Sequence, residues 1–392
     1  MRSLRKMVCI LAVTLALPMV VGMAYAQWDR AVLEPLTSGP DNDTLGRRAL
    51  EIDDSGTLHA IYSRGLGSSH DIYYVSKPPG GIWSAPEPLG SPDSAPGIWC
   101  LAVRKETGEP YVTFFRGFDL TLGIRRATGW EFHTLATPPD FPPGKMAVTV
   151  DSDGYAHVAM VVRRENPLVW QIAYGYWDGS PDFHFQVLQY SLLVHYGLFT
   201  GPDIVVRPDG SVAILYQQDR FEYVVQISEN SSLGGTDWRS SFINLPDVIL
   251  YPGSLAISPH EDLHVAFYVN IELGAANTVY YSHRRAHDRT WETPVEISGP
   301  FRGARPRIAL SGKNGVHVVF EETLGPRATG RLIYAAPDRS GNWQASVLLD
   351  DRAFTPSLVM DREGNGSILF EREVVQLEDK DIEYYGYVQP AP

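Results

Sequence analysis

The chain has 392 residues and carries 46 acidic against 33 basic side chains, a formal net charge of -13. This acidic balance argues against binding to nucleic acid or to an anionic membrane surface. With only Cys9 and Cys100 the chain is not a disulfide-rich scaffold, and its length permits two domains or one large all-β domain.

The first 26 residues have the three parts of a secretory signal peptide. A basic start is followed by an uncharged apolar stretch from Met7 to Met23 and by the small-x-small triplet Ala24-Tyr25-Ala26. We expect cleavage after Ala26. The alternative is an uncleaved anchor, because about 17 apolar residues lie near the lower limit for spanning a bilayer.

Cleavage at this point has three consequences. It removes Cys9, so Cys100 is left without a partner for a disulfide. It also removes three cations, which leaves 30 basic against 46 acidic side chains, a net charge of -16. We therefore expect a secreted or periplasmic protein whose residues 27–392 form a single domain. That domain is predicted to be a monomer with no membrane contact.

Self-similarity at about 50 residues dominates the mature chain, and this period is typical of four-stranded propeller blades. Each unit opens with a short apolar strand that ends in a tight turn, mostly of Asp and Gly. A second strand follows at once, then a Tyr-rich third strand, and then in most units a strand that begins near a Trp. The seven opening strands begin at Leu50, Val103, Val148, Ile204, Leu255, Ile308 and Leu358.

The two ends of the chain complement each other in this pattern. Q-W-D-R-A-V-L-E-P from Gln27 has the form of a Trp strand but follows no unit, whereas the chain ends on a third strand, D-I-E-Y-Y-G-Y-V. We predict that the first strand completes the last unit, which leaves no open blade. The fold prediction is an all-β, seven-bladed propeller. Six blades are the alternative if the turn at Gly108, which lacks an Asp, is accidental.

Two columns of the repeat have a structural explanation. One holds four of the eleven histidines, each on a different unit, and such positions lie too far apart to share a metal ion. We expect each imidazole to bond to a neighbouring turn or blade, and we predict no metal site and no cofactor. The histidines are His59, His157, His264 and His317. The bulky column that follows, expected between adjacent sheets, is Tyr62, Phe114, Met160, Tyr216, Phe267, Phe320 and Phe370.

The residues around the loop ends of the second strands break the repeat and are the candidate site. In a propeller they border one mouth of the central channel. Cations gather on the first three units and acids on the last two, an arrangement suited to a ligand with a carboxylate or sulfate group. The candidate ligand-binding residues are Arg47, Arg48, Arg64, Arg116, Arg163 and Trp99. The candidate catalytic residues, if the protein is an enzyme, are Asp71, Tyr251, Glu321 and Glu371.

The first unit, R-R-A-L-E-I-D-D-S-G-T-L-H-A-I-Y-S-R, resembles the opening blade of the sialidase superfamily, with its F/Y-R-I-P motif and G-T-L-x-A turn. D-R-S-G-N-W from Asp338 is similar to the Asp-box of that superfamily's neuraminidase repeats. The resemblance implies a sialidase-like propeller. It would place the family arginine on Arg47 or Arg48 and the general acid near Asp71. The last unit resembles the family's Y-S-x-L segment, with Thr355 where the family has its nucleophilic Tyr.

Three functions fit these observations, and whether the protein is an enzyme stays open. We favour a non-catalytic protein that binds a glycan or another extracellular ligand, because Thr355 cannot replace an activated phenol. The second is an enzyme for acidic sugars. A glycosidase would pair Asp71 with Glu321 or Glu371, and a polysaccharide lyase would use His70 or Tyr251 as its base. The third is a scaffold that binds other proteins.

Overall fold

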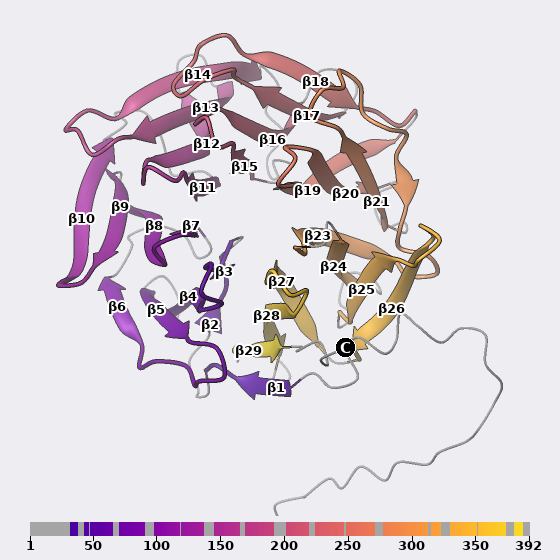
Figure 1. Ribbon diagram of the computed structural model, residues 1–392, viewed down its shortest axis with the longest axis horizontal. Helices are drawn as coiled ribbons and strands as arrows, with labels where there is room; N and C mark the ends of the chain where they lie inside the picture. The colour runs from indigo at the N-terminus through magenta and orange to yellow at the C-terminus, as the bar shows by residue number, and fades with distance from the viewer. Residues whose placement is uncertain are drawn as a thin grey trace, which may run out of the picture.

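The computed structural model describes most of the chain after residue 31. The described ranges are 32–37, 43–46, 48–65, 70–90, 98–117, 119–136, 145–164, 169–191, 201–218, 224–246, 248–270, 277–312, 315–322, 330–350, 352–373 and 380–386. No helix in these ranges is long and apolar enough to cross a membrane. The strands are arranged as a ring of sheets around an axis (Figure 1), which confirms the all-β propeller.

The described strands form seven separate antiparallel sheets, numbered here as blades in chain order. Blade 1 contains β2 (Asp43–Thr44), β3 (Leu50–Ile52), β4 (Leu58–Arg64), β5 (Asp71–Lys77) and β6 (Glu87–Gly90). Blade 2 contains β7 (Trp99–Arg104), β8 (Glu109–Arg116), β9 (Asp119–Arg126) and β10 (Gly129–Ala136). Blade 3 contains β11 (Met146–Val150), β12 (Ala156–Arg164), β13 (Val169–Trp177) and β14 (His184–Ser191). Blade 4 contains β15 (Asp203–Val206), β16 (Val212–Gln218), β17 (Val224–Glu229) and β18 (Arg239–Ile243).

The remaining blades follow the same order from the axis outward. Blade 5 contains β19 (Ile249–Ile257), β20 (Leu263–Asn270), β21 (Asn277–Arg284) and β22 (Val295–Glu296). Blade 6 contains β23 (Gly303–Leu310), β24 (Val316–Glu322), β25 (Leu332–Pro337) and β26 (Trp343–Leu349). Blade 7 contains β27 (Ala353–Met360), β28 (Gly366–Glu373), β29 (Lys380–Gly386) and β1 (Val32–Pro35). The turn at Gly108 joins β7 to β8 within a complete sheet of its own. Blade 1 departs from the four-stranded prediction because β2 and β3 both pair with β4.

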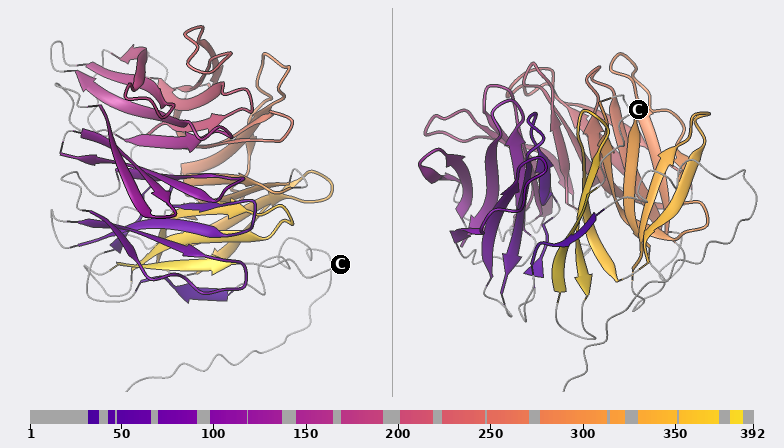
Figure 2. Two further views of the ribbon diagram at one scale, coloured as in Figure 1. Left: turned by 60° about the vertical axis from the view of Figure 1, so that its left-hand side comes forward. Right: turned by 60° about the horizontal axis from the view of Figure 1, so that its bottom comes forward.

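The first described strand closes the ring as predicted. β1 pairs antiparallel with β29, so that Leu33 faces Tyr385 and Glu34 faces Tyr384. Figure 2 shows from two further angles that the indigo strand β1 lies against the yellow strands at the carboxyl end. Trp28 itself lies outside the described residues. The bulky column is also confirmed, because all seven of its side chains are at most 2 % exposed.

The two mouths of the ring differ in how they are built. The tight turns that join each innermost strand to the second strand lie at one end, which we call the hairpin side. The second strands end, and the third strands begin, at the other end, which we call the loop side.

The four repeated histidines bond within their own blades. Their Nδ1 atoms lie 2.6 to 2.8 Å from a Tyr hydroxyl on the third strand. The Nε2 atoms of His59 and His157 also lie 3.4 and 3.2 Å from Asp53 and Asp151 in the adjacent turns. The contact with a turn was predicted, whereas the Tyr partner was not. The Tyr partners are Tyr74, Tyr174, Tyr281 and Tyr334.

These buried histidines make stability depend on pH. Burial lowers the pKa of His264 and of His317 to about 4, since the charged imidazolium loses its hydration. Above pH 6.5 both rings are neutral in the folded and unfolded chain. Between pH 6.5 and 4 only the unfolded chain takes up these protons. The free energy of unfolding therefore decreases by up to about 3 kcal/mol per ring as the pH is lowered from 6.5 to 4. Urea unfolding of His317→Gln from pH 7 to 4 should show a shallower decline than wild type, whereas His287→Gln, at an exposed position, should not.

The pairing of β1 with β29 predicts that an engineered disulfide can join the two ends of the fold. Leu33→Cys with Tyr385→Cys joins residues that face each other in register, and the buried Cys100 should not compete. Because the closed loop spans almost the whole domain, the disulfide should stabilise the fold by about 3 to 5 kcal/mol. Free-thiol counts and thermal unfolding with and without reductant measure this. Leu33→Cys with Glu383→Cys, two residues out of register, should leave both thiols free, and a bridge in this control would contradict the pairing.

Candidate functional site

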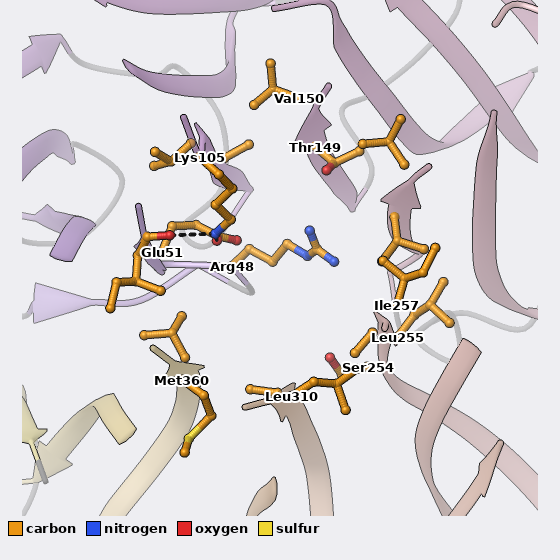
Figure 3. Close-up of a pocket in the computed structure, with 18 of the residues that line it drawn as sticks. Arg48, Glu51, Lys105, Thr149, Val150, Ser254, Leu255, Ile257, Leu310 and Met360 are labelled. Carbon is orange, nitrogen blue, oxygen red and sulfur yellow. Dashed lines mark hydrogen bonds and ion pairs between the residues drawn. The ribbon is translucent and has the colours of Figure 1, made fainter. Parts of the chain in front are cut away.

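The innermost strands of all seven blades surround a cavity of about 510 Å³ on the axis of the ring (Figure 3). Its lining includes Lys105, Glu106, Ser152 and Pro208 in the tight turns. Glu106, Ser152 and Pro208 are exposed, so the cavity reaches the surface on the hairpin side. This volume lies within the range of about 300 to 1,000 Å³ that is usual for small-molecule sites.

An ion pair crosses the axis at the inner end of the cavity. Arg48 comes from blade 1, and its Nε donates to Asp203 Oδ1 of blade 4 at 2.7 Å. The other oxygen of Asp203 accepts from the backbone N–H of Leu255 in blade 5 at 2.8 Å. Arg48 Nη1 also lies 3.3 Å from the carbonyl oxygen of Val148 in blade 3. One pair of side chains thereby connects four blades.

Arg307 of blade 6 bonds to the two neighbouring blades. Its Nε donates to the carbonyl of Pro356 at 3.2 Å, and its Nη1 to that of Gly253 at 3.3 Å. We call Arg48, Asp203 and Arg307 the axial crossbar. Burial works to lower the pKa of Arg48, but the charge of Asp203 is the main opposing effect and the pKa is raised. Arg48 is therefore charged at any physiological pH.

The wall between the crossbar and the hairpin side is aliphatic. Six blades each contribute one half-buried or buried aliphatic side chain at the same level of the innermost strand, a set we call the aliphatic collar. None of the residues that line the cavity is aromatic. At the rim Lys105 Nζ bonds to Glu51 and to the carbonyl of Ile52, both at 2.7 Å. The collar consists of Ile52, Val150, Val206, Ile257, Leu310 and Met360.

On the loop side of blade 1, Arg64 is held by three groups. Its Nε donates to the buried Asp43 at 3.2 Å. Its guanidinium carbon lies 5.7 Å from the centre of the Tyr62 ring and 5.8 Å from that of Tyr73. Asp71 faces Arg64 in the register of β4 and β5. The side chain is partly exposed, so it can meet a ligand without a large rearrangement.

Blade 2 has an equivalent arrangement at the end of β8. Arg116 is exposed, and its guanidinium carbon lies 5.6 Å from the centre of the Phe114 ring and 5.2 Å from that of Phe132. Such cation–π contacts contribute about 0.5 to 1 kcal/mol at exposed sites and fix the orientation of the guanidinium. Consecutive blades thus present an arginine that is held over aromatic rings.

The two glutamates proposed for catalysis are buried and hold adjacent blades together. Glu321 accepts from the backbone N–H of Thr355 in blade 7 at 3.2 Å, and it pairs with Arg305 at 3.0 Å. Glu371 accepts from the N–H of Leu45 in blade 1 at 2.9 Å. Their exposed fractions are only 5 % and 4 %. We call Glu321 and Glu371 the bridging carboxylates.

The other predicted site residues lie apart from the cavity. Tyr251 is buried and stacks on Tyr268, with ring centroids 5.0 Å apart. Trp99 is fully buried and packs against Gly46, where a Cβ would lie 2.9 Å from the indole. Arg47 lies outside the described residues, as does the side chain of Arg163. The described cavity therefore contains one predicted site residue, Arg48.

Sequence reasoning missed Asp203, which completes the crossbar. A signal was present, because Asp203 and Arg307 are the two charged residues in a column that is otherwise small or apolar. Opposite charges on the axis of one ring can pair across it, and that pairing depends on the closed ring rather than on sequence spacing. The column consists of Ala49, Leu101, Ala147, Asp203, Ser254, Arg307 and Ser357. In the described ranges no group of three His, Cys, Asp or Glu residues is arranged to hold a metal ion.

Comparison with known proteins supports the fold. No family model and no curated protein matches the sequence. Among solved structures, a PL25 ulvan lyase bound to -[GlcA(1-4)Rha3S]- is similar with a TM-score of 0.59 and 12% identity, covering 88% of this chain and 93% of the lyase. A protein of unknown function from Dyadobacter fermentans has a TM-score of 0.52 and 11% identity over 91% of this chain and 99% of its own.

A third similar structure has a different chemistry. A fungal alcohol oxidase in complex with copper has a TM-score of 0.52 and 10% identity, over 89% of this chain and 76% of the oxidase. Identities this low establish the propeller fold alone. The resemblance to sialidases remains a prediction.

The bridging carboxylates predict a test of stability. Glu321→Ala should lower the free energy of unfolding by about 1 to 3 kcal/mol, because the Thr355 N–H loses its acceptor in a buried setting. Urea unfolding at pH 7 measures the loss. Glu296→Ala, at an exposed position on β22, should change stability by less than about 0.5 kcal/mol. Equal effects for the two variants would contradict the bridging role.

Proposed function

We propose that this chain is an exported propeller that binds an acidic carbohydrate at its loop side. The observation that carries the proposal is the pair of arginines on consecutive blades, Arg64 and Arg116, each held over aromatic rings. A planar guanidinium binds a carboxylate or a sulfate through two parallel hydrogen bonds. Ligands with repeated anionic groups would match two such arginines.

The electrostatics favour a local anion site on an acidic protein. Arg116 is exposed and makes no ion pair with a carboxylate in the part of the chain that the structure describes. Its charge is therefore available to a ligand. The fold is shared with a lyase that was crystallised with a uronate and sulfate-bearing saccharide, which supports the same ligand class here.

The hydrogen bonds of the predicted catalytic glutamates favour a binding protein over a glycoside hydrolase. A glycosidase needs two carboxyl groups that flank the sugar and exchange protons with it. Glu321 and Glu371 instead accept backbone hydrogen bonds from the next blade, so these carboxylates are already engaged, unlike Nε2 of His70. The second carboxyl group that a glycosidase needs beside Asp71 would then not come from Glu321 or Glu371.

A second candidate function, elimination by a polysaccharide lyase, is favoured by His70. This residue directly precedes β5 and is 6 % exposed, and its Nε2 has no hydrogen-bond partner among the described residues. A lyase needs a neutral base to remove the proton next to the uronate carboxylate, and a cation to stabilise the charge that develops. His70 and Arg64 would take these roles.

Calorimetric titration with uronate-containing, sulfated and neutral oligosaccharides tests the proposal. Wild type should bind at least one acidic oligosaccharide and not its neutral counterpart. Arg64→Ala and Arg116→Ala should each weaken binding about 10-fold or more, as expected for the loss of one charge-assisted contact of about 1.5 to 3 kcal/mol. Arg339→Ala removes the same charge from an exposed hairpin-side turn and should bind as wild type does.

Two results would redirect this conclusion. If no acidic oligosaccharide binds, or if Arg339→Ala weakens binding as much as Arg116→Ala, the loop-side site is wrong. The second result would be the ultraviolet absorbance of an unsaturated uronate during incubation with wild type. If His70→Gln loses this absorbance but still binds the oligosaccharide, the protein is a lyase rather than a binding protein.

A further inference from the structure

The cavity on the hairpin side has a different chemistry from the loop side, and the loop-side proposal does not account for it. Sugars are usually bound by aromatic faces and many hydrogen bonds, but the cavity lining has no aromatic side chain. Its middle is the aliphatic collar, contributed by six blades. Figure 3 shows Val150, Ile257, Leu310 and Met360 around the space into which the Arg48 guanidinium projects.

The charges of the cavity are unevenly placed. At the inner end the axial crossbar has two guanidiniums and one carboxylate among the described residues. Arg48 keeps 18 % of its side chain exposed although it pairs with Asp203. At the rim Lys105 pairs with Glu51, and Arg207 pairs with Glu229. Glu106 and Asp151 also line the cavity there, so the rim carries an excess of acidic groups. An anionic group therefore gains most at the inner end.

The crossbar also sets the direction of entry. The lining residues nearest the loop side are Arg48, Ser254, Arg307 and Ser357, whereas the loop-side residues Trp99, Tyr251 and Thr355 do not line the cavity. The cavity thus ends at the crossbar, and its exposed lining residues lie in the hairpin-side turns. A ligand enters from that side and meets the collar before it reaches Arg48.

We propose that this cavity is a second binding site, for a small amphipathic carboxylate. The aliphatic part of the ligand lies within the collar, where burial of apolar surface favours binding. The carboxylate faces Arg48, which remains anchored to Asp203 and Val148. The collar selects for an unbranched or singly branched aliphatic body, and the crossbar selects for one negative charge.

Wild-type protein provides the first test, with decanoate and decanol as probes in calorimetric titrations at pH 7. The two probes have the same chain length and differ in the charged group. Decanoate should bind about 10-fold or more tightly than decanol, and inorganic sulfate, which has no aliphatic part, should not compete. Equal affinities, or no binding by either, would overturn the proposal. Binding of a peptide that ends in Leu, without any binding of decanoate, would also overturn it.

Two variants separate the charge from the collar. Arg48→Met with Asp203→Leu replaces the buried ion pair by apolar groups of similar size, a change that folds often tolerate. This double variant should lose the preference for decanoate and keep the affinity for decanol. Leu310→Trp should fill the collar and abolish the binding of both. Thermal unfolding verifies that each variant is folded, and decanoate binding that survives Leu310→Trp would place the ligand elsewhere.

Two single variants distinguish the cavity from the loop-side site. Arg64→Ala should leave decanoate binding as in wild type, and Leu310→Trp should leave oligosaccharide binding as in wild type. A loss of both activities in either variant would indicate one shared site and would contradict the assignment of two.

Discussion

The pairing of β1 with β29 closes the ring of blades, and the packing of every blade relies on that closure. Each sheet of a propeller packs only on its two neighbours, so an unclosed ring would leave an unpaired blade edge and two exposed apolar faces. Closure places Leu33 opposite Tyr385, residues that lie more than 350 positions apart in the chain. The axial cavity exists because the innermost strands of all seven blades face one axis, and this requires the closed ring.

Polar contacts between blades explain why some predicted site residues are not available to a ligand. Glu321 and Glu371 lie directly after the bulky column, at the edge of the loop-side mouth. A buried carboxylate there needs donors, and the backbone N–H groups of the next blade supply them. Gln217 occupies the same column and bonds to the carbonyl of Leu250 in the next blade. One column therefore bridges blades at three of its positions, with different side chains.

The channel separates two kinds of chemistry in a protein with a large negative charge. Arginines held over aromatic rings lie at the loop side, and an aliphatic collar lies at the hairpin side. The axial crossbar stands between them and connects blades through Arg48, Asp203 and Arg307. Asp203 balances the charge of Arg48, and backbone carbonyls accept hydrogen bonds from both guanidiniums, which allows charged groups to stay buried on the axis.

The propeller, the closing strand and the buried columns could be predicted from the repeat, because equivalent residues of a repeat take equivalent places in the fold. The sequence also placed Arg64 and Arg116 at loop ends, since they follow the second strands directly. The pairing of Arg48 with Asp203 and the bond from Glu321 to the next blade became visible in the folded protein alone. Those contacts join residues on different blades across a curved ring, and the periodicity of a chain does not specify which side chains meet there.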